Sequence, residues 1–496
     1  MWNMKSGKRS ESASLSPFRS SRSFPAALFH PSALALIGLL FLFSGCQGEN
    51  NTSRPNLPAG VTNISKSADL SIAPHAAASG STVYVVWQEN VGSQNMEVLL
   101  SRSADGGATF SPPINVSDSP LFSGNPQVAV SGNFVYVVWE ETASADTAQN
   151  NDLDIFYRRG QDENGTFTWY PPLNEPGLTL SNPNHICKNN NSATPGSDPC
   201  PSQLPAIAAS GSNVFVVWAE STVYQFKLIN TTTPPSKDFQ IINSDILMVR
   251  STDNGQQFDS PLVLSGPKSQ STLSPSFNPA LAATSDHVYI AWEDIPQPQP
   301  QPFQSKVLFR KLVDPFNLTF DPGLDQQAKV LSGFIKGSSR PALAAEGDRV
   351  YLAWEGFLPK SSDPKVTTPV CPAVQGYDPL STTEILLIRS DNQGDQFTDP
   401  NDCAQSNFSN TPGSSNGARI ATSGAFVDVA WMDSTPGLAG ILVRRSADSG
   451  ATFSAPSPLS EGGSTANPAI AASDGTLFAF WEDATLGHLD IVFSKK

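Results

Sequence analysis

Apolar and polar residues follow one order that recurs along the chain. The copy at Asn467–Glu482 opens with Pro468 and a run of small and aliphatic residues. It passes through Ser-Asp-Gly and ends in a second apolar run that closes with Trp481 and an acid. Glycine supplies the positive φ that tight turns often need, so each copy predicts a β-hairpin. Six further copies precede it and end at Trp87, Trp139, Trp218, Trp292, Trp354 and Trp431.

Two more apolar runs follow the hairpin in a full unit, which gives four strands, named A to D in chain order. Strand B is apolar at successive positions, as in Val83–Trp87. Such a strand is covered on both faces, as when sheets stack around an axis. Seven hairpins therefore predict an all-β fold, a seven-bladed β-propeller of four-stranded antiparallel blades. The spare length between copies predicts insertions in the B–C and D–A loops, which share one face of the ring: Thr222–Ser244, Ile295–Ser305, Leu358–Thr383 and Asn174–Gln203.

The two ends of the repeat region indicate how the ring closes. The last unit stops after strand C, at Asp490–Lys496, and has no strand D. Gly60–Ser65 matches the D pattern and precedes the first strand A. We therefore expect the N-terminal strand to complete the last blade, which would leave no unpaired edge.

A polar turn recurs between strands C and D, with Ser, then Asp or Asn, then Gly, then Phe at fixed spacing. Its acid or amide is Asp105, Asp253, Asn392 and Asp448 in the four clear copies. These turns resemble the Asp box, or BNR repeat, of sialidase-like β-propellers, and the resemblance spans roughly Ala59–Lys496. The Asp side chain would accept backbone N–H groups in the turn while Phe fixes the turn to the blade. In that family the boxes lie away from the active site, which implies a structural role here.

The resemblance also implies what a sialidase of this kind would carry: three arginines for the substrate carboxylate, a Tyr–Glu pair and an acid/base Asp. The first arginine usually precedes the first strand A, where this chain reads Ser71-Ile72-Ala73-Pro74. Candidates elsewhere are Arg340, Arg419, Tyr224 and Tyr377. The set cannot be assembled from the sequence, so we expect a non-catalytic module that binds a glycan or a protein. The alternatives are an exo-acting, sialidase-type glycoside hydrolase and a scaffold for a surface complex.

Acids follow the strand-B Trp in every unit and form the second candidate site for binding. They are Glu89, Glu140, Glu141, Glu220, Glu293, Asp294, Glu355, Asp433, Glu482 and Asp483. Paired carboxylates suit general acid–base chemistry or Ca²⁺ binding. The competing interpretation is that a residue repeated in every blade caps the B–C turn. The histidines have no metal-ligand spacing and are interpreted as incidental, so we assign no metal and no cofactor: His75, His185, His287 and His488.

The N-terminal residues predict export. Basic residues precede an apolar run, Ala33–Phe43, which is short for a membrane span. Phe43-Ser44-Gly45-Cys46 resembles a bacterial lipobox, which implies a signal peptide over 1–46 with a lipid on Cys46, and a location in the cell envelope. Residues 47–59 would be a flexible tether and 60–496 the propeller. The alternative is an ordinary secretory signal with an incidental cysteine.

Charge and cysteine content narrow the class of partner. The 496 residues carry a net charge of −15, which argues against nucleic acid or an anionic membrane surface as main partner. We attribute this charge to solubility and expect a monomer. Four cysteines remain beside Cys46, an even number suited to disulfides in an exported chain. Cys187 and Cys200 could close one loop, and Cys371 and Cys403 could join two loops.

Overall fold

The structure is a computed structural model, and it describes most of one compact unit, Ser53–Lys496. The described residues are 56–92, 95–142, 153–181, 188–189, 200–228, 237–266, 274–296, 305–315, 317–333, 335–357, 383–435, 439–460 and 465–496. The predicted signal peptide and lipid-bearing Cys46 lie outside these residues. So do Cys187, Cys371, Tyr377 and His185.

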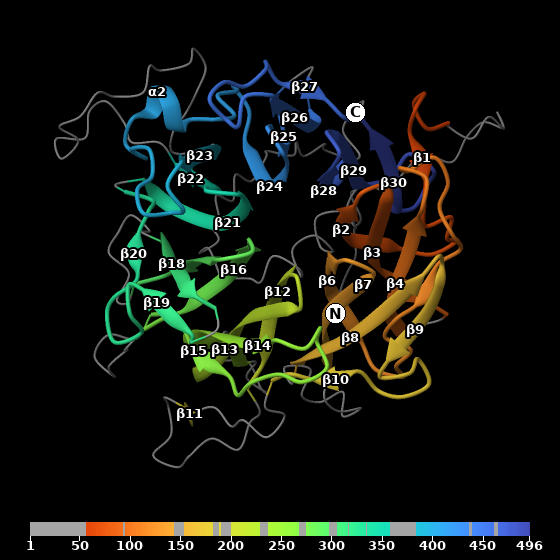
Figure 1. The fold of residues 1–496 in the computed structure, drawn as a ribbon, viewed down its shortest axis with the longest axis horizontal. Coiled ribbons are helices and arrows are strands. Elements are labelled where there is room, and N and C mark those ends of the chain that lie inside the picture. Colours follow the sequence, from red (N-terminus) through yellow and green to blue (C-terminus); the bar gives the residue numbers. More distant parts are fainter. Residues whose placement is uncertain are drawn as a thin grey trace, which may run out of the picture. The chain divides into compact units, whose positions relative to one another are not determined.

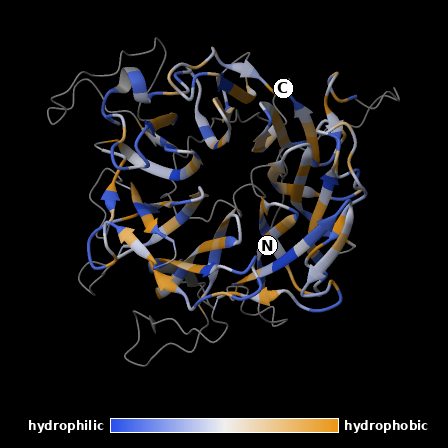
Figure 2. Cartoon of the chain, in the orientation of Figure 1, coloured by the Kyte–Doolittle hydropathy of each residue, from blue (hydrophilic) through white to orange (hydrophobic). Residues whose placement is uncertain are grey.

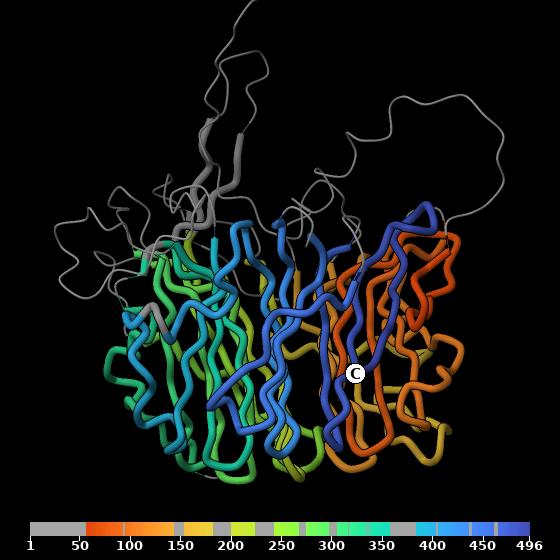
Figure 3. Tube along the Cα trace, turned by 90° about the horizontal axis from the view of Figure 1, so that it is seen from above, coloured from red at the N-terminus to blue at the C-terminus, as the bar shows by residue number. Residues whose placement is uncertain are grey.

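Seven antiparallel sheets surround a common axis, which confirms the seven-bladed β-propeller (Figure 1). Turned by 90°, the strands run roughly along that axis (Figure 3). The innermost strands A are β2 (Ser71–Ser79), β6 (Ser123–Ser131), β12 (Ser202–Ser210), β16 (Ser276–Ala283), β21 (Lys336–Glu346), β24 (Ser415–Ser423) and β28 (Thr465–Ser473). Strands B are β3 (Thr82–Val91), β7 (Phe134–Thr142), β13 (Asn213–Leu228), β17 (Val288–Asp294), β22 (Arg349–Phe357), β25 (Phe426–Asp433) and β29 (Thr476–Asp483).

The outer strands vary more in length, and the six strands D have two residues each. Strands C are β4 (Asn95–Ser103), β8 (Leu153–Glu163), β14 (Lys237–Ser251), β18 (Lys306–Asp314), β23 (Glu384–Ser390), β26 (Gly440–Ser446) and β30 (Asp490–Lys495). Strands D are β5 (Ile114–Asn115), β10 (Leu178–Thr179), β15 (Leu262–Val263), β20 (Lys329–Val330), β27 (Ser457–Pro458) and β1 (Thr62–Asn63). Blade 5 has only a bridge from Leu386 to Asn407 at this place, after the helical turn α2 (Cys403–Ser406). The additional strands are β9 (Thr166–Tyr170), β11 (Lys188–Asn189) and β19 (Thr319–Asp321).

Two predicted insertions contain strands. Asn174–Gln203 includes β10, which is strand D of blade 2, and β11, so this prediction of a loop is corrected. The larger correction is in blade 3. β13 and β14 stay paired beyond the body of blade 3, from Val214 opposite Ser251 to Leu228 opposite Lys237. Most of Thr222–Ser244 is therefore a β-hairpin, which corrects the expectation of a loop. Our strand assignment failed here because it extended each strand only as far as the repeated pattern.

The ring closes through its first strand, as predicted. Thr62 and Asn63 of β1 pair with Phe493 and Val492 of β30. Next to this pair, the N–H of Ile64 donates to the carbonyl of Ile491 at 2.7 Å. The strand that completes blade 7 therefore comes from the opposite end of the repeat region.

The hydrophobic core lies between blades rather than inside any one of them. Each of the seven clusters of buried side chains combines residues of two neighbouring blades. Blades 1 and 7, for example, meet through Val85, Trp87, Phe480 and Phe493. All seven strand-B tryptophans are buried, and hydrophobic stretches recur in strands around the whole ring (Figure 2). Burial on both faces explains why strand B is apolar at successive positions.

The Asp-box turns contact the preceding blade. Asp105 accepts the N–H of Thr109 at 2.8 Å, and its Oδ1 also accepts the hydroxyl of Ser103 at 2.8 Å. Phe110, at the end of this turn, packs edge-on against Phe493 of blade 7, with ring centroids 5.0 Å apart. Phe258, Phe397 and Phe453 pack in the same way on rings of blades 2, 4 and 5. Each turn thus ties two blades together at this end of the ring.

Candidate functional site

The acids that follow the strand-B tryptophans form two sets with different surroundings. One set lies two residues after Trp: Glu89, Glu141, Glu220, Asp294, Asp433 and Asp483. The other lies one residue after Trp: Glu140, Glu293, Glu355 and Glu482. Successive side chains of a strand point to opposite faces, so the two sets cannot share one function.

The first set connects strands B and A within a blade. Glu141 accepts the indole N–H of Trp139 at 2.8 Å and the hydroxyl of Ser123 at 3.2 Å. Equivalent tryptophan bonds recur in blades 1, 3, 6 and 7. Among the described residues the indole N–H groups of Trp292 and Trp354 have no partner, and Gly356 takes the place of the acid in blade 5. The carboxylates of this first set therefore accept hydrogen bonds that stabilise the blades.

The second set connects each blade to the next one, near the start of strands A. Glu482 accepts Asn467 Nδ2 at 2.8 Å from its own blade and the N–H of Ala73 at 2.7 Å from blade 1. Glu140 does the same with Asn125 Nδ2, at 3.0 Å, and the N–H of Leu204, at 2.5 Å. The residues that these glutamates bind lie at one bulge of strand A, where φ is positive in all seven blades. Asparagine tolerates this conformation better than most residues.

Blade 5 departs from this pattern. Arg340 occupies the bulge with φ 45°, where blades 2, 4 and 7 have asparagine. Its Nη1 lies 3.3 Å from Glu355 Oε1, which also accepts the N–H of Gly417 at 2.7 Å. The Arg340 side chain is 46% exposed, whereas that of Glu355 is only 5% exposed. A partly exposed cation thus lies where blades 2, 4 and 7 have a neutral amide.

Arg419 lies on the neighbouring inner strand, two residues after Gly417. At the equivalent position four blades have alanine, namely Ala206, Ala280, Ala342 and Ala469. Arg419 is half-buried, and its Nη1 donates to the carbonyl of Ala418 at 3.0 Å. Among the described residues it forms no ion pair. Burial and the positive charge of Arg340 lower the pKa of Arg419, while Glu355 raises it, so these three side chains lie within electrostatic range of one another.

Burial also weakens the negative charge around these arginines. It raises the pKa of Glu293 to about 7, and raises the pKa of Glu355 and Glu482 as well. Arg340 opposes the rise of the pKa at Glu293 and Glu355. Near neutral pH a large fraction of Glu293 is uncharged. The inner strands of blades 5 and 6 therefore present more positive than negative charge, which suits an anionic ligand.

His75 holds the position of Arg419 in blade 1. Its Nδ1 accepts the N–H of Val128 at 3.2 Å, across the boundary with blade 2. Burial and the positive charge of Arg419 lower the pKa of His75 to about 3. The imidazole is therefore neutral near pH 7. We interpreted this histidine as incidental from the sequence, and the repeat alignment would have shown that alanine is the usual residue here.

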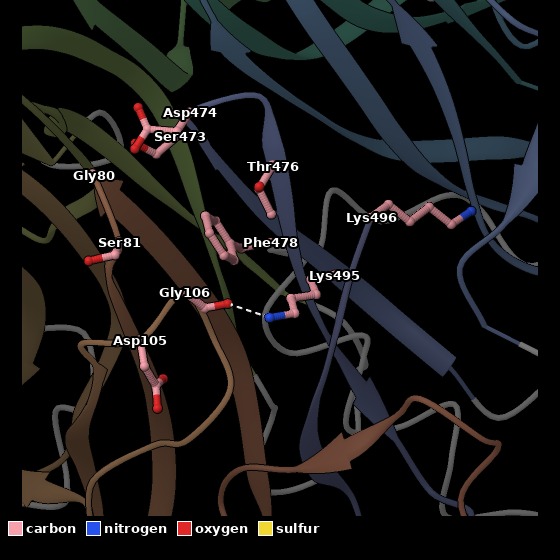
Figure 4. Close-up of a pocket in the computed structure, with 10 residues that line it drawn as sticks. All are labelled: Gly80, Ser81, Asp105, Gly106, Ser473, Asp474, Thr476, Phe478, Lys495 and Lys496. Carbon is pink, nitrogen blue, oxygen red and sulfur yellow. Dashed lines mark hydrogen bonds between the residues drawn. The ribbon is translucent and has the colours of Figure 1, made fainter.

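The opposite face of the ring carries the Asp boxes and arginines that are paired with acids. Arg250 pairs with Asp259 at 2.5 Å and Arg389 with Asp391 at 3.4 Å. A pocket of about 390 Å³ lies there between the A–B turns of blades 7 and 1 (Figure 4). Lys495 Nζ is directed to the carbonyl of Gly106 in this pocket, at 2.8 Å. Its lining mixes cations and acids.

The other predicted residues are placed as follows. Tyr224 lies in β13, and Tyr377 is outside the described residues, so neither candidate role is tested. Cys200 is buried, but both predicted disulfides involve residues outside the described ones, and they stay predictions. In the described part of the chain, no three His, Cys, Asp or Glu side chains gather as a metal site. A search of the same residues finds no helix with the length and apolar character of a membrane span.

Comparisons with known proteins identify the fold and nothing more. No protein-family model and no curated protein matches the sequence. A polysaccharide lyase of family PL25, an ulvan lyase, has a TM-score of 0.54 at 10% identity, covering 87% of this chain and 95% of that chain. The Trypanosoma rangeli sialidase in complex with sialic acid has a TM-score of 0.45 at 11% identity, covering 89% and 59%. A Hadza microbial sialidase has a TM-score of 0.43 at 12% identity, covering 83% and 73%.

The likeness to the polysaccharide lyase, together with the seven sheets, defines the class of the protein as a β-propeller of the architecture found in that lyase. At such low identity the activity of the lyase does not carry over. The site must be argued from the side chains of this chain, and the charged or titratable ones that differ from the repeat pattern on strands A include Arg340, Arg419 and His75.

Proposed function

We propose that this protein is a non-catalytic binding module for a glycan that carries an anionic group, and that Arg340 and Arg419 bind this group. The observation that carries the proposal is the guanidinium of Arg419. It lies half-buried on an inner strand and has no ion-pair partner among the described residues. A charge partly withdrawn from water is costly unless a counter-charge accompanies it. The planar fork of arginine suits carboxylate and sulfate oxygens.

Two considerations favour a glycan over a protein as the source of the anionic group. The arginines lie on innermost strands, where a narrow polymer reaches them more easily than a folded surface does. An ulvan lyase of the same fold has also been solved bound to -[GlcA(1-4)Rha3S]-, with a TM-score of 0.53 and 10% identity to this chain. That repeat contains both a carboxylate and a sulfate, which are the groups that a pair of arginines binds well.

A non-catalytic role is favoured because strands A supply two arginines in the described part of the chain, where a sialidase of the resembled family would use three. The glutamates within electrostatic range of them already accept backbone hydrogen bonds from the next blade, Glu355 from Gly417 and Glu293 from Arg340. A sialidase-type glycoside hydrolase is the competing function, and its activity is measured directly in the test below.

The test compares the wild-type protein with Arg419→Gln and Arg340→Asn by isothermal titration calorimetry. The probes are a glucuronate-containing oligosaccharide, a sulfated oligosaccharide and a neutral oligosaccharide of equal length. We expect the wild type to bind at least one charged probe and to ignore the neutral one. Each substitution should weaken binding at least tenfold, the cost of removing a charged hydrogen bond of about 1.5–3 kcal/mol. Equal affinity for charged and neutral probes would refute the proposal, and turnover of a fluorogenic sialoside would replace it with the hydrolase.

We also propose that the module is exported and anchored in a bacterial cell envelope through a lipid on Cys46. The support is the basic and apolar sequence before Phe43-Ser44-Gly45-Cys46. Metabolic labelling with an alkynyl fatty acid should mark the wild type and leave Cys46→Ser unlabelled in the envelope fraction. Equal labelling of both proteins would contradict the anchor and favour an ordinary secretory signal.

A further inference from the structure

His75 is not explained by the packing of the repeat. It shares its strand-A position with Gln127 and Arg419, whereas four blades have alanine there. Alanine therefore suffices for contact between neighbouring inner strands. The three polar exceptions lie in blades 6, 1 and 2, and the inner strand of blade 7, with Ala469, lies between those of blades 6 and 1. His75 is thus larger than the packing needs and lies within electrostatic range of the unpaired Arg419, which suits contact with a ligand.

The hydrogen bond to Nδ1 fixes which nitrogen of His75 carries the proton. Nδ1 accepts the backbone N–H of Val128 at 3.2 Å, so in the neutral ring the proton is on Nε2. Among the described residues Nε2–H has no hydrogen-bond partner. The side chain is half-buried on an innermost strand. The ring thus presents one oriented and unused donor.

We propose that His75, through Nε2–H, donates a hydrogen bond to an oxygen of the same glycan whose anionic group Arg419 binds. This inference rests on the proposed function and deepens it. It makes the ligand a sugar unit that presents a carboxylate or sulfate together with a nearby hydroxyl or ring oxygen. A simple inorganic anion could satisfy Arg419 but would lack the second contact.

The surroundings of His75 keep this donor uncharged. Arg419 is the charged group that acts on the ring among the described residues, and its positive charge disfavours an imidazolium. A neutral donor orients the bound sugar through one hydrogen bond and adds no net charge to the site. It therefore favours sugars with an oxygen in the right place and does not strengthen the binding of every anion. We therefore expect the affinity for a sugar acid to be independent of His75 ionisation from pH 5.5 to 8.

The test uses the full-length protein, with methyl glucuronide and glucose 6-sulfate as probes and methyl glucoside as the uncharged blank. His75→Met removes the donor at similar size, and His75→Gln places an amide Nε2 donor near the original one. His287→Met, near the A–B turn of blade 4, is the matched control. We expect H75M to weaken the better charged probe about 3- to 10-fold, H75Q to recover most of the loss, and H287M to match the wild type. The His75 Nε2–H signal in long-range ¹H–¹⁵N spectra should also move when that probe is added.

The outcomes separate this inference from the function on which it rests. If Arg419→Gln abolishes binding while H75M binds as the wild type does, the role of His75 is overturned and the anion site stands. If the wild type binds neither charged sugar, both proposals fail. If H75Q is as weak as H75M although both melt at the wild-type temperature, the ring shapes the site and does not act as a donor. The preference between glucuronide and sulfate identifies the source of the anionic group.

Discussion

Arg340 in blade 5 occupies the bulge that Asn467 holds in blade 7, and each side chain binds the glutamate one residue after its own strand-B Trp. The distances are 3.3 Å from Arg340 Nη1 to Glu355 and 2.8 Å from Asn467 Nδ2 to Glu482. Both residues have positive φ, 45° and 47°. Asparagine thus suffices for the backbone conformation and the hydrogen bond at this position. The positive charge of Arg340 is not needed for either.

Replacing Arg340 by Asn should therefore separate stability from binding. Asn tolerates positive φ and can donate to Glu355 as Asn467 does to Glu482. We expect the melting temperature of R340N to equal or exceed that of the wild type, while its affinity for a sugar acid falls at least tenfold. Differential scanning calorimetry and titration calorimetry measure the two quantities. A drop of several degrees in melting temperature would show that the guanidinium is needed by the fold.

The Asp-box turn of blade 1 contains two glycines that should respond differently to alanine. Gly106 has φ 62° and open space around it, whereas a Cβ on Gly107, with φ 78°, would lie 2.5 Å from the Phe493 ring. G106A should cost about 1 kcal/mol from backbone strain alone. G107A adds a clash with blade 7 and should cost about 2 kcal/mol or more. Urea unfolding of both variants checks this difference, and equal losses would contradict the contact between turn and blade.

Glu293 should make the protein less stable as the pH rises. Burial raises its folded-state pKa to about 7 from 4.5, so the folded protein binds this proton more tightly than the unfolded chain does. The stability due to the neutral carboxyl is complete below pH 4.5 and is lost as the pH rises through 7. Glu293→Gln keeps an acceptor for Asn278 and cannot ionise. Relative to the wild type, E293Q should gain about 2–3 kcal/mol between pH 4.5 and 7.5. Parallel stability curves would contradict the raised pKa.

Pairing with β1 should protect the backbone amides of β30 from hydrogen exchange. Ile64→Pro removes the N–H that donates to Ile491 at 2.7 Å. We expect the amides of β30 to exchange rapidly in I64P, as measured by hydrogen–deuterium exchange with mass spectrometry. Val116→Pro is the control, because Val116 makes the same 2.7 Å bond to Val98 inside blade 1. V116P should leave β30 protected, and similar exchange in both variants would argue against a specific closure.

The fold could be predicted from the sequence because its determinants are repeated. In every blade a Trp, a turn and an apolar strand make the same contacts, so seven similar sequence patterns, each weak alone, support the same fold. The closing strand was predictable for the same reason, since Gly60–Ser65 was a D pattern without a blade. The hairpin extension of β13 and β14 was missed because it occurs once and follows no repeat.

The candidate site was harder to predict because its residues depart from the repeated pattern of the blades. Arg340 and Arg419 lie in different blades, and the packing of blade 5 against blade 6 brings them within electrostatic range. His75 looked incidental because no sequence spacing joins it to Arg419. The division of the acids into two sets could have been predicted, since Glu140 and Glu141 are neighbours in a strand and must face opposite ways.

The pairing of β1 with β30 has a consequence for biosynthesis. Ser65 donates its hydroxyl to Asp490 at 2.9 Å, across a sequence separation of 425 residues. A ribosome delivers the first of these groups long before the second. The ring of blades therefore cannot close through β1 and β30 until the last blade has been translated. Truncated chains lack the contact between β1 and β30. Their first strand therefore stays unpaired, and proteases can cleave it.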